Sequence, residues 1–241
     1  MAGKRSDIHT DGVPVLCRSC EARHRGICGA LTSDELTELA RHTHKARHAP
    51  GEELIGDGTD VDSFANVMRG VVKLSKGLED GRRQIVGLQF APDFLGRPFG
   101  SENTLTAEAA SEVELCVVSK TALERMMAEK PALENRLMHQ TLRELDEARD
   151  WLVTVGRKTA LERVASLLHR IATYTDPAAE SGGEVTFELP LTRADAADFL
   201  GLTLETVSRQ LGALRRLGVI RITGTRMVTV PELRSLKALC G

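Results

Sequence analysis

Residues 191–217 read LTRADAADFLGLTLETVSRQLGALRRL and have the spacing of a helix-turn-helix. Thr192 is placed to cap a first short helix, and Ala196 is small where two helices must approach closely. Gly201 supplies the tight turn, and Thr203 caps the second helix. This stretch therefore predicts two short helices packed across a turn.

The second helix has two distinct faces. Its predicted inward face is apolar and consists of Leu204, Val207, Leu211 and Leu214. Glu205, Ser208 and Arg209 lie on the opposite face near its start, where a recognition helix meets base edges. Arginine can bond guanine through two hydrogen bonds and glutamate can accept one from cytosine. The alternative is a solvated face with an ion pair between Glu205 and Arg209.

The surroundings of this helix favour DNA binding over a merely solvated surface. Apolar stretches at 219–222 and 227–230, with a turn near Gly224, predict a hairpin after the second helix. Five residues are expected to contact phosphates and so to position the protein without reading sequence: Thr192, Arg193, Thr203, Arg215 and Arg216.

The charge is divided unevenly along the chain. The 241 residues carry a formal net charge of −2. The first 156 residues hold 20 Lys and Arg against 25 Asp and Glu, a net of −5, whereas residues 157–241 hold 12 against 9, a net of +3. The basic share coincides with the predicted DNA-reading part.

The first half of the chain has a different pattern. Thr32 or Ser33 can cap a short helix that runs through Leu39. From residue 49 to 119, short apolar stretches such as 71–74, 85–88 and 113–118 alternate with glycine-containing turns. This pattern predicts an antiparallel β-sandwich or barrel.

Residues 122–155 hold the longest helical pattern, with a second helix able to begin at Pro131. Apolar and small residues recur there at spacings of three and four, as in a coiled-coil seam: Met138, Thr141, Leu145, Ala148, Leu152 and Val155. Such a stripe often packs within its own domain. Here Leu133, Leu137 and Leu142 form a second apolar edge that can serve the domain core, so we expect the first seam to form a homodimer.

Five cysteines remain to be explained. Cys17, Cys20 and Cys28 form a C-x2-C-x7-C pattern within residues 1–30, which are polar enough to suggest an arm rather than a core. A soft metal centre can gather three such thiols and take a fourth from elsewhere. Cys116 lies in an apolar strand pattern, where a lone cysteine is usually a buried hydrophobe. Four thiolates alone leave zinc and an iron-sulfur cluster both open, although zinc sites usually use two closely spaced pairs.

The cysteine set and the Glu-x-x-Ser-Arg pattern at 205–209 together resemble the CRP/FNR superfamily of transcription regulators. Within it, the chain is similar to the FNR branch, specifically oxygen-responsive regulators of the FnrL type. The resemblance implies an α+β fold with a cupin-like antiparallel β-roll sensor domain, a long dimerisation helix and a winged helix-turn-helix domain. The expected boundaries are 1–30 for the cysteine arm, 31–120 for the roll, 121–156 for the dimer helix and 157–241 for the DNA-binding domain.

The resemblance also implies a mechanism. Cys17, Cys20, Cys28 and Cys116 would hold a [4Fe-4S] cluster that oxygen degrades. Under low oxygen the homodimer would bind double-stranded DNA at an inverted repeat of TTGAT-like half-sites, recruit RNA polymerase and control anaerobic gene expression. Glu205 and Arg209 would read the C·G pair, and Ser208 a thymine or a phosphate.

Three other classes are less well supported. A regulator with structural zinc or a small-molecule effector is the nearest alternative. A cAMP pocket is not expected, because the matching stretch at 94–104 lacks the Glu and the Arg that hold the ribose and phosphate in that branch. An enzyme is not expected either, since no nucleotide loop, nucleophile set or paired carboxylates are evident. With no apolar run of ~18 residues and no signal-peptide pattern, we expect a cytoplasmic protein without a membrane segment.

Overall fold

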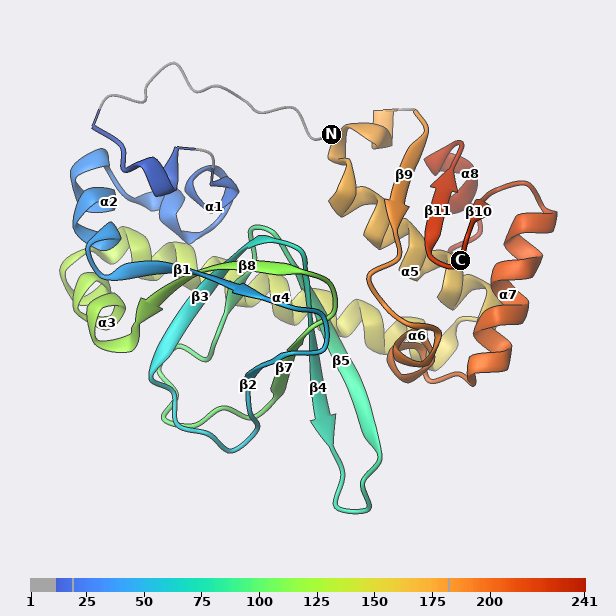
Figure 1. The fold of residues 1–241 in the computed structure, drawn as a ribbon, viewed down its shortest axis with the longest axis horizontal. Coiled ribbons are helices and arrows are strands. Elements are labelled where there is room, and N and C mark those ends of the chain that lie inside the picture. The colour runs from blue at the N-terminus through green and yellow to red at the C-terminus, as the bar shows by residue number, and fades with distance from the viewer. Residues whose placement is uncertain (1–11, 19, 182) are drawn as a thin grey trace. The chain divides into compact units, whose positions relative to one another are not determined.

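Short antiparallel strands occupy the first half of the chain, as the glycine-punctuated pattern predicts. The computed structural model describes residues 12–18, 20–181 and 183–241 (Figure 1). The chain divides into two units, one of Met1–Lys76 with Val86–Asp146 and the other of Gly77–Ile85 with Glu147–Gly241. The domain boundaries expected from the sequence remain predictions.

The strands β1 to β8 form two four-stranded sheets with the orders β1-β8-β3-β6 and β2-β7-β4-β5. The bounds of the strands are β1 Thr43–His48, β2 Glu53–Ile55, β3 Ser63–Arg69, β4 Val71–Gly77, β5 Arg83–Phe90, β6 Phe94–Leu95, β7 Thr106–Ala109 and β8 Val113–Ser119. The predicted antiparallel β-fold is confirmed.

Short helices precede and follow these strands. They are the 3-10 turns η1 Val15–Cys17 and η2 Ile27–Ala30, and the helices α1 Glu21–His24, α2 Ser33–Ala40 and α3 Lys120–Glu129. Thr32 caps α2, as predicted: its hydroxyl accepts from the backbone N–H of Glu35, whose carboxylate accepts from the N–H of Thr32. This bond and an ion pair with Lys130 lower the pKa of Glu35 to about 2.

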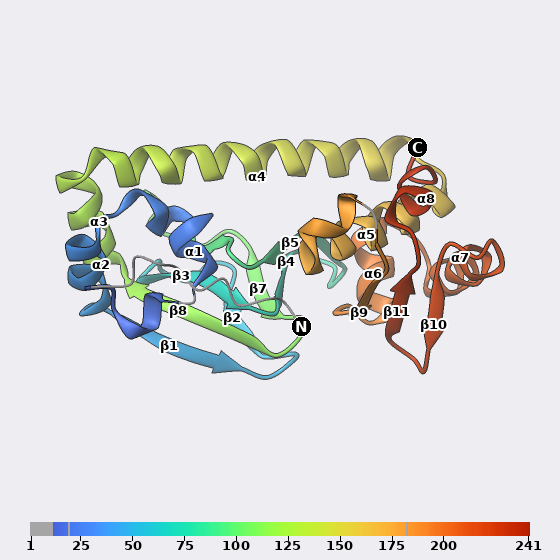
Figure 2. The ribbon, with the colours of Figure 1, turned by 90° about the horizontal axis from the view of Figure 1, so that it is seen from above.

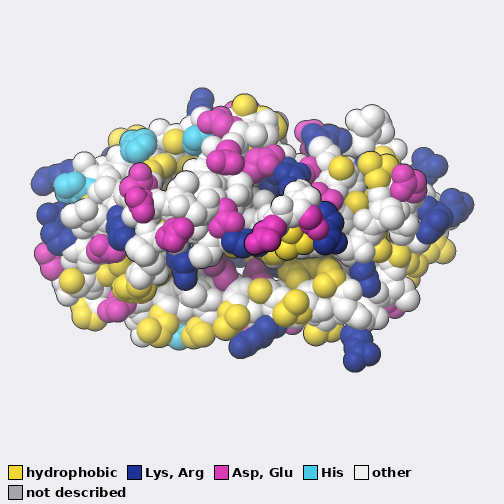
Figure 3. Space-filling view, turned by 90° about the horizontal axis from the view of Figure 1, so that it is seen from below, with side chains coloured by type: hydrophobic (Ala, Val, Ile, Leu, Met, Phe, Trp, Pro, Cys, Tyr) yellow, Lys and Arg dark blue, Asp and Glu magenta, His cyan; other side chains and the backbone are white. Residues whose placement is uncertain are grey.

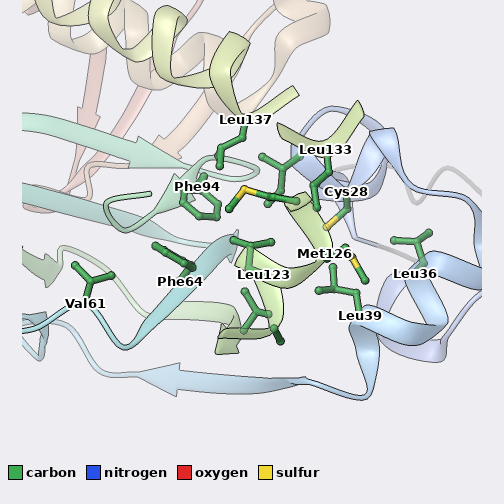
Figure 4. Close-up of a cluster of buried hydrophobic side chains, with 14 residues drawn as sticks. Cys28, Leu36, Leu39, Val61, Phe64, Phe94, Leu123, Met126, Leu133 and Leu137 are labelled. Carbon is green, nitrogen blue, oxygen red and sulfur yellow. The ribbon is translucent and has the colours of Figure 1, made fainter. Parts of the chain in front are cut away.

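A core cluster joins η2, α2, α3 and the start of α4 to one face of the first sheet (Figure 4). Ile27 is 1% exposed and Cys28 is 8% exposed, and both belong to this cluster. Val13, Cys20 and Ala22 are buried as well, so the expectation that residues 1–30 lie outside the core is wrong for these five residues. The reason is local: Ile27 is the apolar residue that anchors the segment, because it packs with Leu36 and Leu133 in the same cluster.

The helix α4 begins at Pro131, as predicted, and ends at Arg157. Leu133 and Leu137 are buried, which confirms them as an inward edge, but Leu142 is 50% exposed, so its predicted place in the core is wrong. Leu142 follows Leu137 by five residues, which turns its side chain about 140° away on an α-helix. Gln140 and Thr154, at the proper spacing, are buried instead.

The residues of the predicted dimer seam face away from this buried edge. Met138, Leu145 and Leu152 are 59%, 43% and 70% exposed, Thr141 and Ala148 are exposed, and Val155 is partly buried. Five of the six seam residues are thus exposed in the single chain, and the role of the seam in dimerisation remains a prediction.

The second unit contains the C-terminal helices and a three-stranded sheet of order β10-β11-β9. Its elements are α5 Ala160–Thr175, η3 Pro177–Ser181, β9 Val185–Glu188, α6 Arg193–Leu200, α7 Leu204–Arg216, β10 Arg221–Thr223, β11 Met227–Val230 and α8 Leu233–Lys237. Trp151 of α4 packs on Phe199 of α6 with ring centroids 4.4 Å apart, and the guanidinium of Arg170 lies 5.8 Å from the Trp151 ring.

None of the helices in the described part of the chain is both long enough and apolar enough to cross a membrane.

Gly70, between β3 and β4, offers a test of this packing. Its φ is +84°, and a Cβ there would lie 2.1 Å from the Glu112 carbonyl oxygen. Gly51 has a similar φ of +87° in open space. We expect Gly70→Ala to lower the free energy of unfolding by about 2–5 kcal/mol and Gly51→Ala by about 1–2 kcal/mol, since only the first adds a clash to backbone strain. Urea unfolding followed by circular dichroism measures both; equal losses would contradict the clash.

Candidate functional site

One face of the first sheet brings chemical groups from three strands together. Asn66 of β3 pairs with Cys116 of β8, which in turn pairs with Lys45 of β1. Directly paired residues point to the same side of a sheet, and so does Thr43, two residues before Lys45. The sheet therefore presents an amide, a thiol and a hydroxyl on a single face.

The cysteine segment, residues 15–18 and 20–30, lies over that face. Cys17 ends η1, Cys20 is the N-cap residue of α1, and Cys28 lies in η2. Figure 2 shows α1 between α4 and the strands of this unit. The segment turns sharply at Gly26, where a Cβ would lie 2.9 Å from the Cα of Ala22, so the close approach requires glycine.

A side chain of α4 holds the turn in place. The guanidinium of Arg136 donates from Nε to the carbonyl oxygen of Gly26 at 3.2 Å and from Nη2 to that of Arg25 at 3.1 Å. Two charge-assisted bonds from one side chain fix both position and orientation. The cysteine segment is therefore tied to α4 as well as to the sheet.

The segment and the sheet enclose a small cavity that all four predicted metal ligands line. Its walls are formed by Cys17, Cys20, Arg23, Cys28, Leu36, Leu39, Ala40, Thr43, Asn66, Cys116 and Val118. All five cysteines of the chain are free thiols. The fifth, Cys240, belongs to the second unit, where its thiol donates to the carbonyl oxygen of Leu236 at 3.4 Å.

The cavity favours neutral thiols in the absence of a metal. Burial raises the pKa of Cys17, Cys20 and Cys28, and it raises the pKa of Cys116 to about 11. The thiols, which line one cavity, also raise one another's pKa by mutual repulsion of their charged forms. Arg23 lowers the pKa of Cys17. Metal binding here must displace protons.

Thiols are the soft metal-ligating groups that line the cavity. No three His, Cys, Asp or Glu side chains among residues 12–18, 20–181 and 183–241 converge on the position of a single metal ion. The four thiols line a shared cavity, and in an iron-sulfur cluster each iron takes its own thiolate. Cys17, Cys20, Cys28 and Cys116 are the residues that could hold such a group.

The sequence-based prediction omits Arg136 and Lys45, and it also omits two polar residues that contact the thiols directly. Asn66 is 3% exposed, and its Nδ2–H donates to the sulfur of Cys28 at 3.9 Å. The hydroxyl of Thr43 is hydrogen-bonded to Cys116 and lowers the pKa of that thiol. The only signal for Asn66 in the sequence is an amide in the middle of an otherwise apolar strand, residues 64–67.

The helix-turn-helix forms as predicted. The Thr192 hydroxyl accepts from the N–H of Asp195 at 3.0 Å and caps α6. Gly201 ends α6 with a φ of +60°, and Thr203 caps α7, accepting from the N–H of Thr206 at 3.2 Å. The hairpin of β10 and β11 follows, although β10 begins two residues after the predicted start at 219.

The start of α7 presents the predicted base-reading residues to the outside. Glu205, Ser208 and Arg209 are all exposed, and Arg209 donates to the Thr206 hydroxyl at 3.4 Å. Hydrogen bonds from its own N–H and from the Thr203 hydroxyl lower the pKa of Glu205, so its carboxylate is held as an acceptor.

The inward face of α7 is shorter than predicted. Val207, Leu211 and Leu214 are buried, but Leu204 is 46% exposed, so its predicted place on that face is wrong. Leu204 is the first residue of α7, beyond the region that the other helices of this unit cover. This leaves an apolar side chain beside the residues predicted to read bases.

The predicted phosphate-contacting cations differ in exposure. Arg215 and Arg216 are exposed, and in Figure 3 Lys and Arg side chains gather at the right-hand end, where Figure 1 places α7. Arg193 is partly buried and donates to the Thr225 carbonyl oxygen at 3.3 Å, which secures the hairpin turn. Burial and the neighbouring Arg226 lower the pKa of Arg193. Phosphate contacts from these residues, Thr192 and Thr203 remain predictions.

Comparison with known proteins matches both units. The family model of Crp-like helix-turn-helix domains matches residues 162–239, and that of cyclic nucleotide-binding domains matches residues 45–130. A probable transcriptional activator of Rhizobium leguminosarum bv. viciae is 52% identical, covering 98% of this chain and 97% of the relative. The transcriptional activator protein FnrL of Cereibacter sphaeroides is 43% identical, with 91% and 90% covered.

A solved structure agrees with these relatives. The structure of FixK2 from Bradyrhizobium japonicum is 32% identical and superposes with a TM-score of 0.73, covering 83% of this chain and 98% of that one. The resemblance that the cysteines and the 205–209 pattern indicate is thereby confirmed at the level of the family. The chain belongs to the CRP/FNR family of transcription regulators.

Proposed function

We propose that this chain is a transcription activator that senses oxygen through a [4Fe-4S] cluster held by Cys17, Cys20, Cys28 and Cys116. The observation that carries the proposal is the meeting of these four thiols in one cavity although Cys116 is 88 residues from Cys28 in sequence. The similarity to FnrL, a transcriptional activator, agrees with it.

The residues of the chain supply the ligands and their surroundings. Bound there, the cluster would supply sensitivity to oxygen, which degrades it. The thiols must lose their protons to act as ligands, and the cations Arg23 and Lys45 ease that loss at Cys17 and Cys116. Leu36 and Leu39 line the cavity and limit the entry of water.

The same packing links the ligands to the dimer seam. Cys28 shares a core cluster with Leu133 and Leu137 of α4, and Arg136 of α4 holds the turn before Cys28. Loss of ligation frees the cysteine segment and loosens this end of α4. The exposed seam on the other side of α4, from Met138 to Val155, is the surface that pairs two chains into a homodimer.

Dimerisation sets DNA affinity because the two recognition helices must enter successive major grooves ~34 Å apart. Glu205, Ser208 and Arg209 would read each TTGAT-like half-site of an inverted repeat, and the bound dimer would recruit RNA polymerase. The stretch at 94–104 lacks the acidic and basic residues expected of a cAMP pocket, so we propose no cAMP.

Cys116→Ser tests the ligand set. We expect anaerobically purified wild-type protein to contain iron and acid-labile sulfide and to absorb near 400 nm. The variant should lose the iron, the sulfide and the absorption, because one iron loses its thiolate. Cys240→Ser is the matched control and should retain full iron and sulfide. Full loading of Cys116→Ser removes this residue from the site, and stoichiometric zinc without sulfide in the wild type favours structural zinc.

Arg209→Ala tests base reading. We expect a loss of ~1–3 kcal/mol in specific DNA binding and a relaxed preference at one base pair. Arg216→Ala, on the same helix, should instead weaken specific and random DNA alike and reduce the salt dependence. Fluorescence anisotropy with palindromic and scrambled duplexes measures both effects. Equal losses on the two duplexes for Arg209→Ala would refute its role.

Leu152→Glu tests the seam. Leu152 is 70% exposed in the single chain, so a charge there costs little in the monomer but opposes burial in a dimer. We expect at least ~1.5 kcal/mol weaker dimerisation, about tenfold, by analytical ultracentrifugation under anaerobic conditions. Val153→Glu, adjacent but off the seam and 57% exposed, should leave the dimer intact. A full dimer of Leu152→Glu contradicts the seam.

A further inference from the structure

We infer that Asn66 tunes the stability and the potential of the proposed metal centre by donating a hydrogen bond to the sulfur of Cys28. The inference rests on the proposed function and extends it to a residue outside the ligand set. Asn66 acts through Cys28 and is therefore a positioning residue rather than a ligand.

The sheet register places Asn66 at the floor of the cavity. It is the direct partner of Cys116 across the β3–β8 pair. Its side chain contacts Cys28 of the cysteine segment, which packs on this face of the sheet. The Asn66 Nδ2–H lies 3.9 Å from the Cys28 sulfur, within the range of a bond to sulfur, and the side chain is 3% exposed. The bond is thus shielded from water.

Packing alone does not favour an amide at this position. The Oδ1 of Asn66 is buried without a hydrogen-bond partner among the described residues. A buried unpaired carbonyl oxygen costs free energy that an apolar side chain of similar size avoids. The polar contact that the amide does make is the one to sulfur.

A donor to Cys28 acts on a thiol that is largely shielded from water. It is 8% exposed and shares the cavity with three other thiols, so negative charge on it is poorly solvated. Cys28 also receives its own backbone N–H, Cys20 receives those of Ala22 and Arg23, and Cys116 interacts with Thr43. Hydrogen bonds to sulfur withdraw electron density and are one of the factors that set the potential of iron-sulfur centres.

The test compares Asn66→Leu and Asn66→Ala with Gln89→Leu. Both Asn66 variants lack the donor. Leucine fills the space of the asparagine side chain, whereas alanine leaves part of it empty. An effect that both variants share is therefore not caused by a single packing defect. Gln89 is the matched control: it is 7% exposed, its Oε1 is also buried without a partner in the described chain, and it does not line the cavity.

Each protein is purified anaerobically, assayed for iron and sulfide, and then exposed to air-saturated buffer while the visible absorption is followed. We expect the Asn66 variants to lose the absorption about fivefold faster than wild type, the change that ~1 kcal/mol produces. Their midpoint potential should be more negative in an anaerobic redox titration. Gln89→Leu should match the wild type in both measurements.

The outcomes separate this inference from the proposed function. Asn66 variants that match the wild type in decay rate and potential overturn the inference and leave the cluster proposal intact. The inference is also overturned if Gln89→Leu changes the two readouts as much, because the effect is then one of any buried amide. A wild-type chain without iron and sulfide overturns the proposed cluster and the inference with it.

Discussion

The packing of η2 against the first sheet supports both the core and the candidate metal centre of the first unit. Ile27 and Cys28 are neighbours in the chain, and both are buried in the cluster that holds Leu36, Phe64 and Leu133. The apolar neighbour fixes the segment, and Cys28 is carried with it to the sheet. Cysteine placement therefore depends on the hydrophobic effect before any metal binds.

The packing around η2 has an apolar side and a side that carries polar and thiol groups. The apolar side of the cluster joins α3 and α4, whereas the cavity side carries four thiols, an amide and a guanidinium. A metal centre held at the cavity would add ligand bonds to the packing that holds the segment on the sheet. The cavity and α4 share the packing of Cys28 with Leu133 and Leu137.

Local rules account for what the sequence predicts well. The caps at Thr192 and Thr203 and the turn at Gly201 depend on residues within four positions, so spacing alone places them. The first three cysteines are close in sequence, so their spacing alone groups them. Cys116 is predicted as the fourth ligand because the family resemblance implies it. Asn66 and Thr43 escape prediction because their positions depend on the register among β1, β3 and β8, which periodicity does not specify. Leu142 and Leu204 are predicted to be buried but are exposed. Helical periodicity gives the direction of a side chain, but only the tertiary structure shows which part of a helix packs against other elements.

The chain has a single tryptophan, and its place in the second unit has a practical consequence. Trp151 lies on the last turns of α4, against Phe199 of α6 and beside the Arg170 guanidinium, which is itself bonded to Glu147 at 2.6 Å. Its emission spectrum depends on that ring contact and that nearby cation. The native protein thus contains an intrinsic optical reporter of how the end of the long helix is seated on the DNA-reading helices, with no label required.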